Sequence, residues 1–343
     1  MSSAVPPQAT HAPDGPSSLV RRVRWIVPLW AVVAAFAIVT YVRSRQVDLP
    51  MRDPGGTIFT LRLATSLSLF VVLVLVDCTI RTRRRGWSFP RWVRTFRRRW
   101  TGERIFLVLS GLLAYHVVYA CYRNLKSWIA FRDVHDEQLL RFDRDLFGGH
   151  SPAVLLHDLL GEDTAAHVLH VIYESFSWIV PVSFVAALVL VPRIKEGYVF
   201  LASAMWVWIL GLASYYLIPS LGPFATAPEE FAGLARTGIT ETQEKYLAQR
   251  AHLLADPQAH DAFASISAFA SLHVGFTCMI LLMMHYYGFR LATRVMTVYL
   301  AVVMVSTIYL GWHFVVDVPA GVVVAYLAVR LGRLTVRPPR RSA

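Results

Sequence analysis

The chain has 343 residues, of which 55% are hydrophobic, and its mean hydropathy is +0.47. The apolar residues fall into blocks of about 17–25 residues, the length that a helix needs to cross a bilayer, so a single soluble domain is excluded. The net charge of +12 does not indicate a nucleic-acid partner, because ten arginines lie within residues 81–104, a pattern typical of a cytoplasmic loop in a membrane protein.

The first part of the chain, residues 25–104, is predicted to form two transmembrane helices, at 25–42 and 60–80, followed by the Arg-rich cytoplasmic loop. The preceding residues 1–24 are rich in Pro, Ser and Ala and are predicted to be a disordered cytoplasmic tail. The first helix does not resemble a cleaved signal peptide, because its apolar block is long and no small-residue cleavage site follows it.

Six further transmembrane helices are predicted within residues 105–331, which we interpret as one core, and a basic cytoplasmic tail follows at 332–343. The six apolar blocks lie at 105–122, 168–192, 197–218, 272–287, 294–311 and 313–331. The predicted fold is therefore an all-α integral membrane protein with about eight transmembrane helices, in which a six-helix core is preceded by two extra helices.

The basic loops indicate how the chain is oriented. If residues 81–104 are cytoplasmic, both termini and the other short basic loops are cytoplasmic too, in agreement with the excess of Lys and Arg expected on that side. The loop at 43–59, which carries three arginines, is the exception. Two long segments, 123–167 and 219–270, then lie outside. The Arg-, Ala- and Val-rich composition favours a bacterial plasma membrane.

The two long outer segments are predicted to contain helices of their own. Residues 134–160 carry apolar positions on both sides of a Gly-Gly pair, which indicates one or two amphipathic helices at the membrane interface. In the second segment, Thr240 with Gln243 three positions later matches a capping box and predicts a short helix near 241–255. The loop that contains this helix is a candidate lid.

Polar and ionisable residues gather in three clusters at the outer ends of the predicted helices. Such groups are costly in a membrane and are therefore the first candidates for function. The clusters lie at 215–223, 270–275 and 306–317. The charge pattern, which does not depend on these residues, predicts that all three face the same side of the membrane.

The clusters contain two histidines and a carboxylate. His313 and Asp317 are four residues apart and are predicted to share one face of a helix. A carboxylate bonded to one imidazole nitrogen makes the other a better nucleophile or base. His273 follows Ser271 at a predicted helix start, where backbone N–H groups favour an anion. Each pattern alone is often only a structural hydrogen bond, but the three together favour catalysis on one phosphate.

In this order, the clusters resemble the type 2 phosphatidic acid phosphatase superfamily of membrane lipid phosphatases and phosphotransferases, over residues 105–331. The third signature of that family is Ser-Arg, five residues, His, three residues, Asp. Ser306, His313 and Asp317 match this spacing, whereas Thr307 replaces the arginine. The Pro-Ser-Gly-His signature corresponds to the run Ala270-Ser271-Leu272-His273.

The resemblance implies a six-helix catalytic core that needs no metal or other cofactor. It implies that His313 is the nucleophile, Asp317 its orienting carboxylate and His273 the acid for the leaving group. The first signature of the family, a Lys-to-Arg-Pro segment, would fall at 216–223 without any cation. The substrate contacts implied by the signatures are Ser271, Tyr216, Pro219 and Gly222. The Ser-Leu-His and His-aromatic-x-x-Asp elements are most similar to the branch of sphingolipid synthases and inositol phosphorylceramide synthases, which includes inositolphosphotransferases.

Other residues have to supply the cations that hold the phosphate oxygens in this family. Arg123 and Lys126, just beyond the predicted helix at 105–122, are the first candidates, and ordinary extension of these side chains to the membrane interface is the alternative. Arg123 belongs to one helical stripe with His116, Tyr119 and Ser127. Glu174 is a candidate for binding polyol hydroxyls or for pairing with Arg123.

The sequence therefore predicts a lipid phosphotransferase that works at the extracytoplasmic face through a phosphohistidine. It would move a phospho-head group, such as phosphoinositol, from a phospholipid or polyprenyl phosphate to a lipid or polyol acceptor. A phosphatase for lipid or polyprenyl (di)phosphates, with water as acceptor, would use the same residues. A proton-coupled transporter with His273, His313 and Asp317 as a relay is the alternative from another class.

Overall fold

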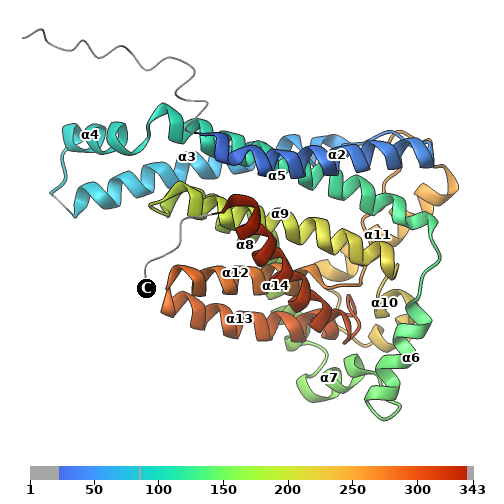
Figure 1. Cartoon of the computed structure of the whole chain (residues 1–343). Coiled ribbons are helices and arrows are strands. Elements are labelled where there is room, and N and C mark those ends of the chain that lie inside the picture. The colour runs from blue at the N-terminus through green and yellow to red at the C-terminus, as the bar shows by residue number, and fades with distance from the viewer. Residues whose placement is uncertain (1–22, 85, 338–343) are drawn as a thin grey trace, which may run out of the picture.

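The computed structural model describes residues 23–84 and 86–337 and is an all-α integral membrane protein (Figure 1). The predicted N-terminal tail up to residue 22, and the basic tail beyond residue 337, lie outside the described residues. The long helices are α2 (Val27–Val47), α3 (Thr60–Arg83), α5 (Gly102–Ser127), α8 (Thr164–Leu190), α9 (Ile194–Leu217), α12 (Leu272–Tyr287), α13 (Arg290–Tyr309) and α14 (Asp317–Val336).

These helices correspond to the eight predicted transmembrane segments. Within the described residues, seven helices are long and apolar enough to cross a membrane. The eighth, α12, has 16 residues and is about 24 Å long, which is less than the ~30 Å of a typical hydrocarbon core. Short 3₁₀ turns flank the helices: η1 (Arg24–Ile26), η2 (Pro54–Gly56), η3 (Trp128–Phe131) and η4 (Pro228–Phe231).

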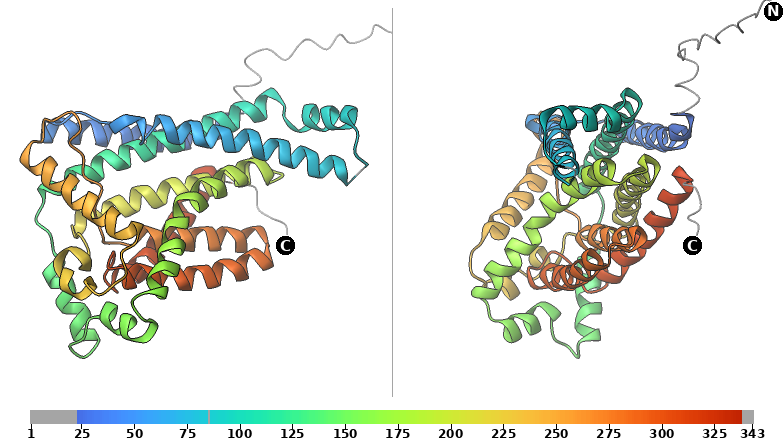
Figure 2. Two further views of the ribbon diagram at one scale, coloured as in Figure 1. Left: turned by 180° about the vertical axis from the view of Figure 1, so that it is seen from behind. Right: turned by 90° about the vertical axis from the view of Figure 1, so that its left-hand side faces the viewer.

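Helix α9 forms the centre of the bundle and is the most buried of the spanning helices. It lies between a layer formed by α2, α3 and α5 and a second group formed by α12, α13 and α14 (Figures 1 and 2). Small residues let α9 and α14 approach closely, because a Cβ at Gly332 would lie 2.4 Å from the Oγ of Ser203. The helix α8 packs on α3, α9 and α13.

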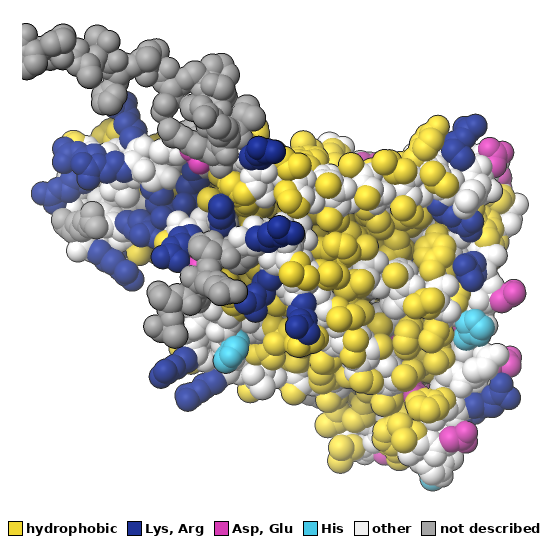
Figure 3. Space-filling view, viewed as in Figure 1, with side chains coloured by type: hydrophobic (Ala, Val, Ile, Leu, Met, Phe, Trp, Pro, Cys, Tyr) yellow, Lys and Arg dark blue, Asp and Glu magenta, His cyan; other side chains and the backbone are white. Residues whose placement is uncertain are grey.

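One end of the bundle is strongly basic, and we call it the arginine end (Figure 3). It contains α4 (Phe89–Arg99), a helix within the segment that the sequence analysis treated only as a loop. Trp92 and Phe96 stack on one face of α4 with ring centroids 5.7 Å apart, and the Trp92 indole donates to the Thr79 hydroxyl of α3. Two aromatic rings one turn apart give α4 an apolar face. In the sequence, the many arginines around these two residues mask this helical periodicity.

Arginines at the arginine end also cap the C-terminus of α8. The Arg104 guanidinium donates to the carbonyl oxygens of Leu188, Val189 and Val191 at 3.1–3.3 Å. Arg99 donates to the Val189 carbonyl at 2.8 Å and pairs with the buried carboxylate of Asp77 at 2.6 Å. Cations at the C-terminal end of a helix satisfy carbonyls that have no partner within the helix and complement its dipole.

The opposite end, which we call the site end, carries four shorter helices beyond the hydrophobic band visible in Figure 3. They are α6 (Asp136–Leu146), α7 (Pro152–Leu160), α10 (Pro223–Thr226) and α11 (Gly238–Ala255). The prediction of amphipathic helices within 134–160 is confirmed by α6 and α7. Gly148 and Gly149, with φ of +63° and +91°, separate these two helices.

The structure corrects two predicted helix starts. Helix α11 begins at Gly238, with Thr237 as N-cap and Thr240 in the third position of the capping box, so Thr240 is not the cap itself. Helix α14 begins at Asp317, so His313 lies in the preceding loop and does not share a helix with Asp317. Gly311, at φ +72°, turns the chain after α13 and makes this loop possible.

Candidate active site

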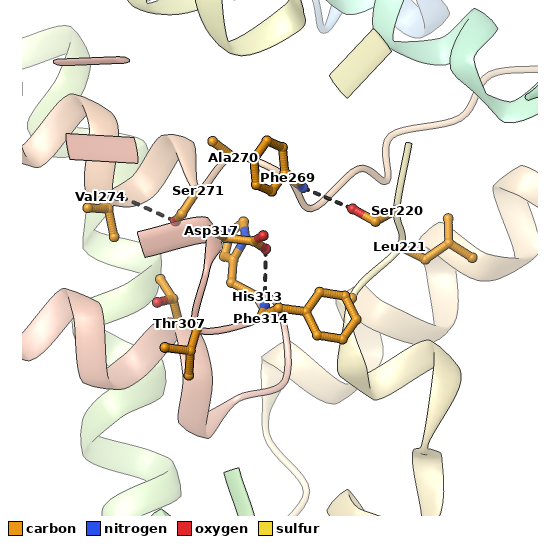
Figure 4. A network of polar contacts seen from close by, with 12 residues as sticks. Ser220, Leu221, Phe269, Ala270, Ser271, Val274, Thr307, His313, Phe314 and Asp317 are labelled. Atoms are coloured by element: carbon orange, nitrogen blue, oxygen red, sulfur yellow. Dashed lines mark hydrogen bonds and ion pairs between the residues drawn. The ribbon is translucent and has the colours of Figure 1, made fainter. Parts of the chain in front are cut away.

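His313 and Asp317 meet at the site end, where the loop after α13 enters the first turn of α14 (Figure 4). Nδ1 of His313 lies 3.1 Å from Oδ2 of Asp317, and the same oxygen accepts the Phe314 backbone N–H at 3.1 Å. Asp317 is fully buried and His313 is 4% exposed. A carboxylate at Nδ1 favours the tautomer that carries its proton there, so Nε2 keeps a free electron pair.

His273 stands beside this pair in the first turn of α12. Its ring is stacked on Tyr173 of α8, with centroids 3.9 Å apart, and Phe176 lies 4.1 Å away on the same helix. The centroids of the His273 and His313 rings are 6.4 Å apart. Reacting atoms in a near-attack arrangement are about 3–3.5 Å apart, so this spacing leaves room for one phosphoryl group between the two imidazoles.

The starts of α12 and α14 are tied together through Ser271. Its backbone N–H donates to the Asp317 carbonyl at 3.1 Å, and its hydroxyl caps α12 by accepting the Val274 N–H at 3.4 Å. A Cβ at Gly321 would lie only 2.5 Å from the Ser271 carbonyl oxygen, so the two helices touch there. Ser271, predicted to contact substrate, is fully buried and holds the two histidine-bearing segments in register.

Two buried carboxylates of α6 support the loops around this pair. Asp136 accepts the backbone N–H groups of Leu221 and Gly222 at 2.8–3.0 Å. Asp143, two turns later on α6, accepts the Val315 N–H at 2.9 Å. Burial raises the pKa of Asp136, although the N–H groups act in the opposite direction. Burial likewise raises the pKa of Asp143, to about 6, against the effect of the Val315 N–H.

The loop at 219–223 packs on the loop that contains His313. Gly222 has φ +114°, and a Cβ there would lie 2.7 Å from the Trp312 carbonyl oxygen, so this close approach requires glycine. The Ser220 hydroxyl accepts the Phe269 backbone N–H at 3.0 Å (Figure 4), which connects the same loop to the segment before α12. The three clusters singled out in the sequence therefore meet at one place.

Both histidines line a cavity of about 670 Å³ at the site end. This volume is typical of small-molecule sites. Three cations line the same cavity: Arg62 of α3, and Arg123 and Lys126 of α5. Its remaining polar lining consists of hydroxyl groups and one carboxylate, contributed by Tyr119, Tyr122, Tyr173, Tyr215, Tyr246, Thr242, Ser175, Ser177, Ser265, Ser267 and Glu174.

The three cations are held by hydroxyl groups and aromatic rings. Arg123 donates to the Ser265 hydroxyl at 2.8 Å, Lys126 Nζ lies 5.1 Å from the Tyr215 ring, and Arg62 lies 4.7 Å from the Tyr119 ring. Within residues 23–84 and 86–337, none of the three has a carboxylate oxygen within 4 Å. The cavity is therefore positively charged and suited to an anion.

Other predicted contacts lie around the cavity rather than in its lining. The Tyr216 hydroxyl donates to the Leu125 carbonyl, and the Pro219 carbonyl accepts the His135 N–H. Gly222 shapes the loop described above. Glu174 does line the cavity, but its carboxylate lies 3.6 Å from His170, so it does not pair with Arg123.

The sequence analysis did not identify Arg62 as a site residue. Its only signal was a cation in the first turn of a predicted apolar helix, a position that interfacial arginines commonly occupy. The hydroxyl groups of Ser265 and Ser267 were also missed, because they lie in an irregular segment where no periodicity distinguishes them. His116, included in the predicted stripe, is buried away from this cavity and contacts the Ser66 hydroxyl at 3.2 Å.

Comparison with known proteins gives one match. The family model of the PAP2 superfamily matches residues 137–331, more than half of the chain. The chain belongs to the PAP2 superfamily. No curated protein and no solved structure matches it. Membership of the PAP2 superfamily supports an enzyme of the phosphatase or phosphotransferase type that acts on lipid or phosphate substrates.

The matched residues contain only part of the cavity. His273, His313 and Asp317 lie within 137–331, whereas the cations Arg62, Arg123 and Lys126 all precede it. The two histidines thus belong to the PAP2 region, and the positive charge that faces them comes from helices α3 and α5 before it.

Proposed function

We propose that the chain is a lipid phosphotransferase that transfers a phospho-head group through a phosphohistidine at His313. The observation that carries this proposal is the spacing of 6.4 Å between the His273 and His313 rings in a cavity that three cations also line. Together these groups can orient a phosphate, attack it and protonate what leaves.

In the first step, Nε2 of His313 attacks phosphorus. The N–P bond forms as the bond from phosphorus to the leaving oxygen breaks, and His273 gives its proton to that oxygen. Asp317 keeps the Nδ1 proton in place and stabilises the positive charge that develops on the ring. Arg123 and Lys126 neutralise the non-bridging oxygens, the role that the absent signature cations have in this family.

In the second step, the acceptor hydroxyl loses its proton to His273 and attacks phosphorus, which breaks the N–P bond and regenerates His313. A polyol acceptor or head group, such as inositol, suits the lining of the cavity, because its hydroxyl groups can donate to Glu174 and exchange hydrogen bonds with Ser265 and Ser267. This supports transfer of the phosphoinositol type, as in the inositol phosphorylceramide synthase branch.

The membrane side of the reaction follows from charge. The catalytic groups lie at the site end, opposite the arginine end, and an excess of Lys and Arg marks the cytoplasmic side. The proposal is therefore a reaction at the extracytoplasmic face of a plasma membrane, with both termini in the cytoplasm.

The test is head-group transfer from labelled phospholipids to lipid or polyol acceptors by the purified protein in vesicles. His313→Ala should lower turnover by at least about 10³-fold. His150→Ala, which changes an exposed histidine at the same end, is the matched control. Retained turnover in His313→Ala would refute the nucleophile assignment. Release of free phosphate would identify a phosphatase, and ion flux without lipid turnover would identify a transporter.

A further inference from the structure

A second pocket of about 340 Å³ adjoins the cavity that contains the histidines. It lies between α3, α5 and α8, three helices that pack on one another. The two spaces share a rim of six residues: Arg62, Tyr119, Phe176, Ser177, Trp178 and Trp208. The two spaces are therefore direct neighbours that meet at these six side chains.

The second pocket runs from this rim toward the arginine end. On α3 it continues from Arg62 to Ser66, and on α8 it continues from Trp178 to Phe184, one to two turns deeper in each case. Helix α5 runs in the opposite direction, and there the pocket continues from Tyr119 back to Tyr115. All three helices place the second pocket below the histidines, at the depth of the hydrocarbon core.

The chemistry of the second pocket changes with depth. Among the described residues, the one charged side chain in its lining is that of Arg62, at the rim. Below the rim the lining is mainly apolar and aromatic, with Val180, Pro181 and Phe184. The buried His116 has both ring nitrogens engaged, by the Ser66 hydroxyl at 3.2 Å and by the Leu112 carbonyl at 2.7 Å. The pocket thus offers one cation at its mouth and an apolar interior, which fits an amphiphile with an anionic head.

We infer that the second pocket binds the hydrocarbon chain of a lipid phosphate substrate, and that Arg62 contacts its phosphate at the junction with the catalytic cavity. This inference rests on the proposed function. Helix α3 supplies Arg62 and one wall of the pocket, yet it lies outside the residues that match the PAP2 superfamily. The N-terminal helices therefore complete the substrate site and select a substrate with an apolar chain.

The first test locates the chain without requiring turnover. The full-length His313→Asn protein, in phosphatidylcholine vesicles, is irradiated with a long-chain alkyl phosphate that carries a diazirine near the end of its chain. Labelled peptides should contain Thr65, Pro181 or Phe184. The matched alkanol, which lacks the phosphate, should label them far less. Equal labelling by the alkanol, or labelling confined to other helices, would overturn the inference, since equal labelling would mean that bulk lipid fills the pocket.

The second test fills the pocket. For short-chain, water-soluble alkyl phosphates, the kcat/KM of the wild type should rise about fourfold for each methylene group that moves from water into the pocket. Thr65→Phe, which places a ring in the pocket, should flatten this dependence on chain length. Ala64→Phe adds the same ring on an exposed, lipid-facing position of α3 and should preserve it. A Thr65→Phe enzyme with the wild-type dependence would overturn the inference.

The two tests separate this inference from the proposed function. If the phosphate probe labels the pocket and the wild-type protein turns over no lipid phosphate, the proposed function is refuted and the binding pocket is supported. Turnover that is independent of chain length, with no label in the pocket, would refute the pocket alone.

Discussion

The two walls of the site-end cavity are built in different ways. One wall carries His273 and His313, which are fixed by stacking, by the buried carboxylate of Asp317 and by backbone hydrogen bonds. The other carries Arg62, Arg123 and Lys126, whose flexible side chains rest on hydroxyl groups and aromatic rings. The first wall lies within residues 137–331, and the second precedes them.

The proposed mechanism accounts for this difference in rigidity between the two walls. Nucleophilic attack depends on the direction of one electron pair, so it requires a rigid imidazole. Neutralising phosphate oxygens depends mainly on charge within a few ångströms, and long side chains can deliver it from several directions. Thr307, at the position of the signature arginine, is fully buried and donates its hydroxyl to the Met304 carbonyl, so it cannot serve the cavity. In the proposed mechanism the positive charge comes instead from α3 and α5.

The largest effect is expected for the wall that carries His273 and His313, which we call the rigid wall. Asp317→Asn should lower kcat on the order of 10³-fold with little change in KM. The new amide can donate to Nδ1 of His313, which moves the ring proton to Nε2 and removes the nucleophilic electron pair. Steady-state kinetics and thermal unfolding of the same preparation separate this effect from misfolding. A folded Asp317→Asn enzyme with nearly normal kcat would contradict the role given to the carboxylate.

A smaller effect is expected for the wall that carries Arg62, Arg123 and Lys126, which we call the cation wall. Lys126→Ala and Arg123→Ala should each lower kcat/KM by about 10–100-fold, the value of one charge-assisted hydrogen bond or ion pair to a phosphate. Part of this loss should appear in KM. Arg132→Ala is the matched control, because Arg132 lies over the Tyr216 ring at the same end but outside the cavity. If the control lost as much activity as Lys126→Ala, the loss would reflect the overall positive charge at this end and not a contact between Lys126 and the phosphate.

Much of the fold could be predicted from the sequence. Long apolar blocks located all eight long helices, although the block of α12 is shorter than the hydrocarbon core, and the Gly148-Gly149 pair separated α6 from α7. The predicted starts of α14 at residue 313 and of α11 at residue 241 were wrong, because apolar content does not reveal where a helix starts. The α14 boundary depends on the turn at Gly311, and the α11 boundary on the capping residue Thr237.

The proximity of His273, His313 and Asp317 could also be predicted, since these residues have fixed spacings within short segments. The cation wall was found only in part. Arg123 and Lys126 are neighbours on one helix, but Arg62 reaches the cavity through the packing of α3 on α5 and α8, which no local pattern encodes. The loop at 43–59 was the exception to the charge rule, and the structure gives one of its arginines, Arg52, a specific hydrogen-bonding role.

Arg52 ties its loop to the segment that precedes Ser265, and its loss should have a moderate effect. Its guanidinium donates to the carbonyls of Ala262 and Pro257 at 2.8 and 3.0 Å, just before the segment that carries Ser265. Arg52→Ala should therefore lower kcat/KM by about three- to tenfold and speed proteolysis of the 256–262 segment. Arg45→Ala, in the last turn of α2, is the control. Unchanged proteolysis of the segment in Arg52→Ala would contradict this link.

The smallest effect concerns Asp143, the carboxylate that supports the loop of the rigid wall. Its pKa is raised from 3.8 to about 6 in the folded protein. Between these values the folded protein keeps a proton that the unfolded chain releases, so the free energy of unfolding falls as the pH rises. The stabilising contribution is complete below pH 3.8 and is lost above about pH 6.

Asp143→Asn cannot titrate and should lack this contribution. Relative to the variant, the wild type should be most stable near pH 4, and its advantage should decline toward pH 6 and then stay constant. Thermal midpoints of both proteins in one detergent measure this, with Asp145→Asn, at an exposed position of α6, as the control. Since Asp143 accepts the Val315 N–H, two residues after His313, a pH-dependent difference would show that the rigid wall depends on a carboxylate outside the membrane. If the thermal midpoints of the wild type and Asp143→Asn depend on pH in the same way, Asp143 does not stabilise the loop that contains His313.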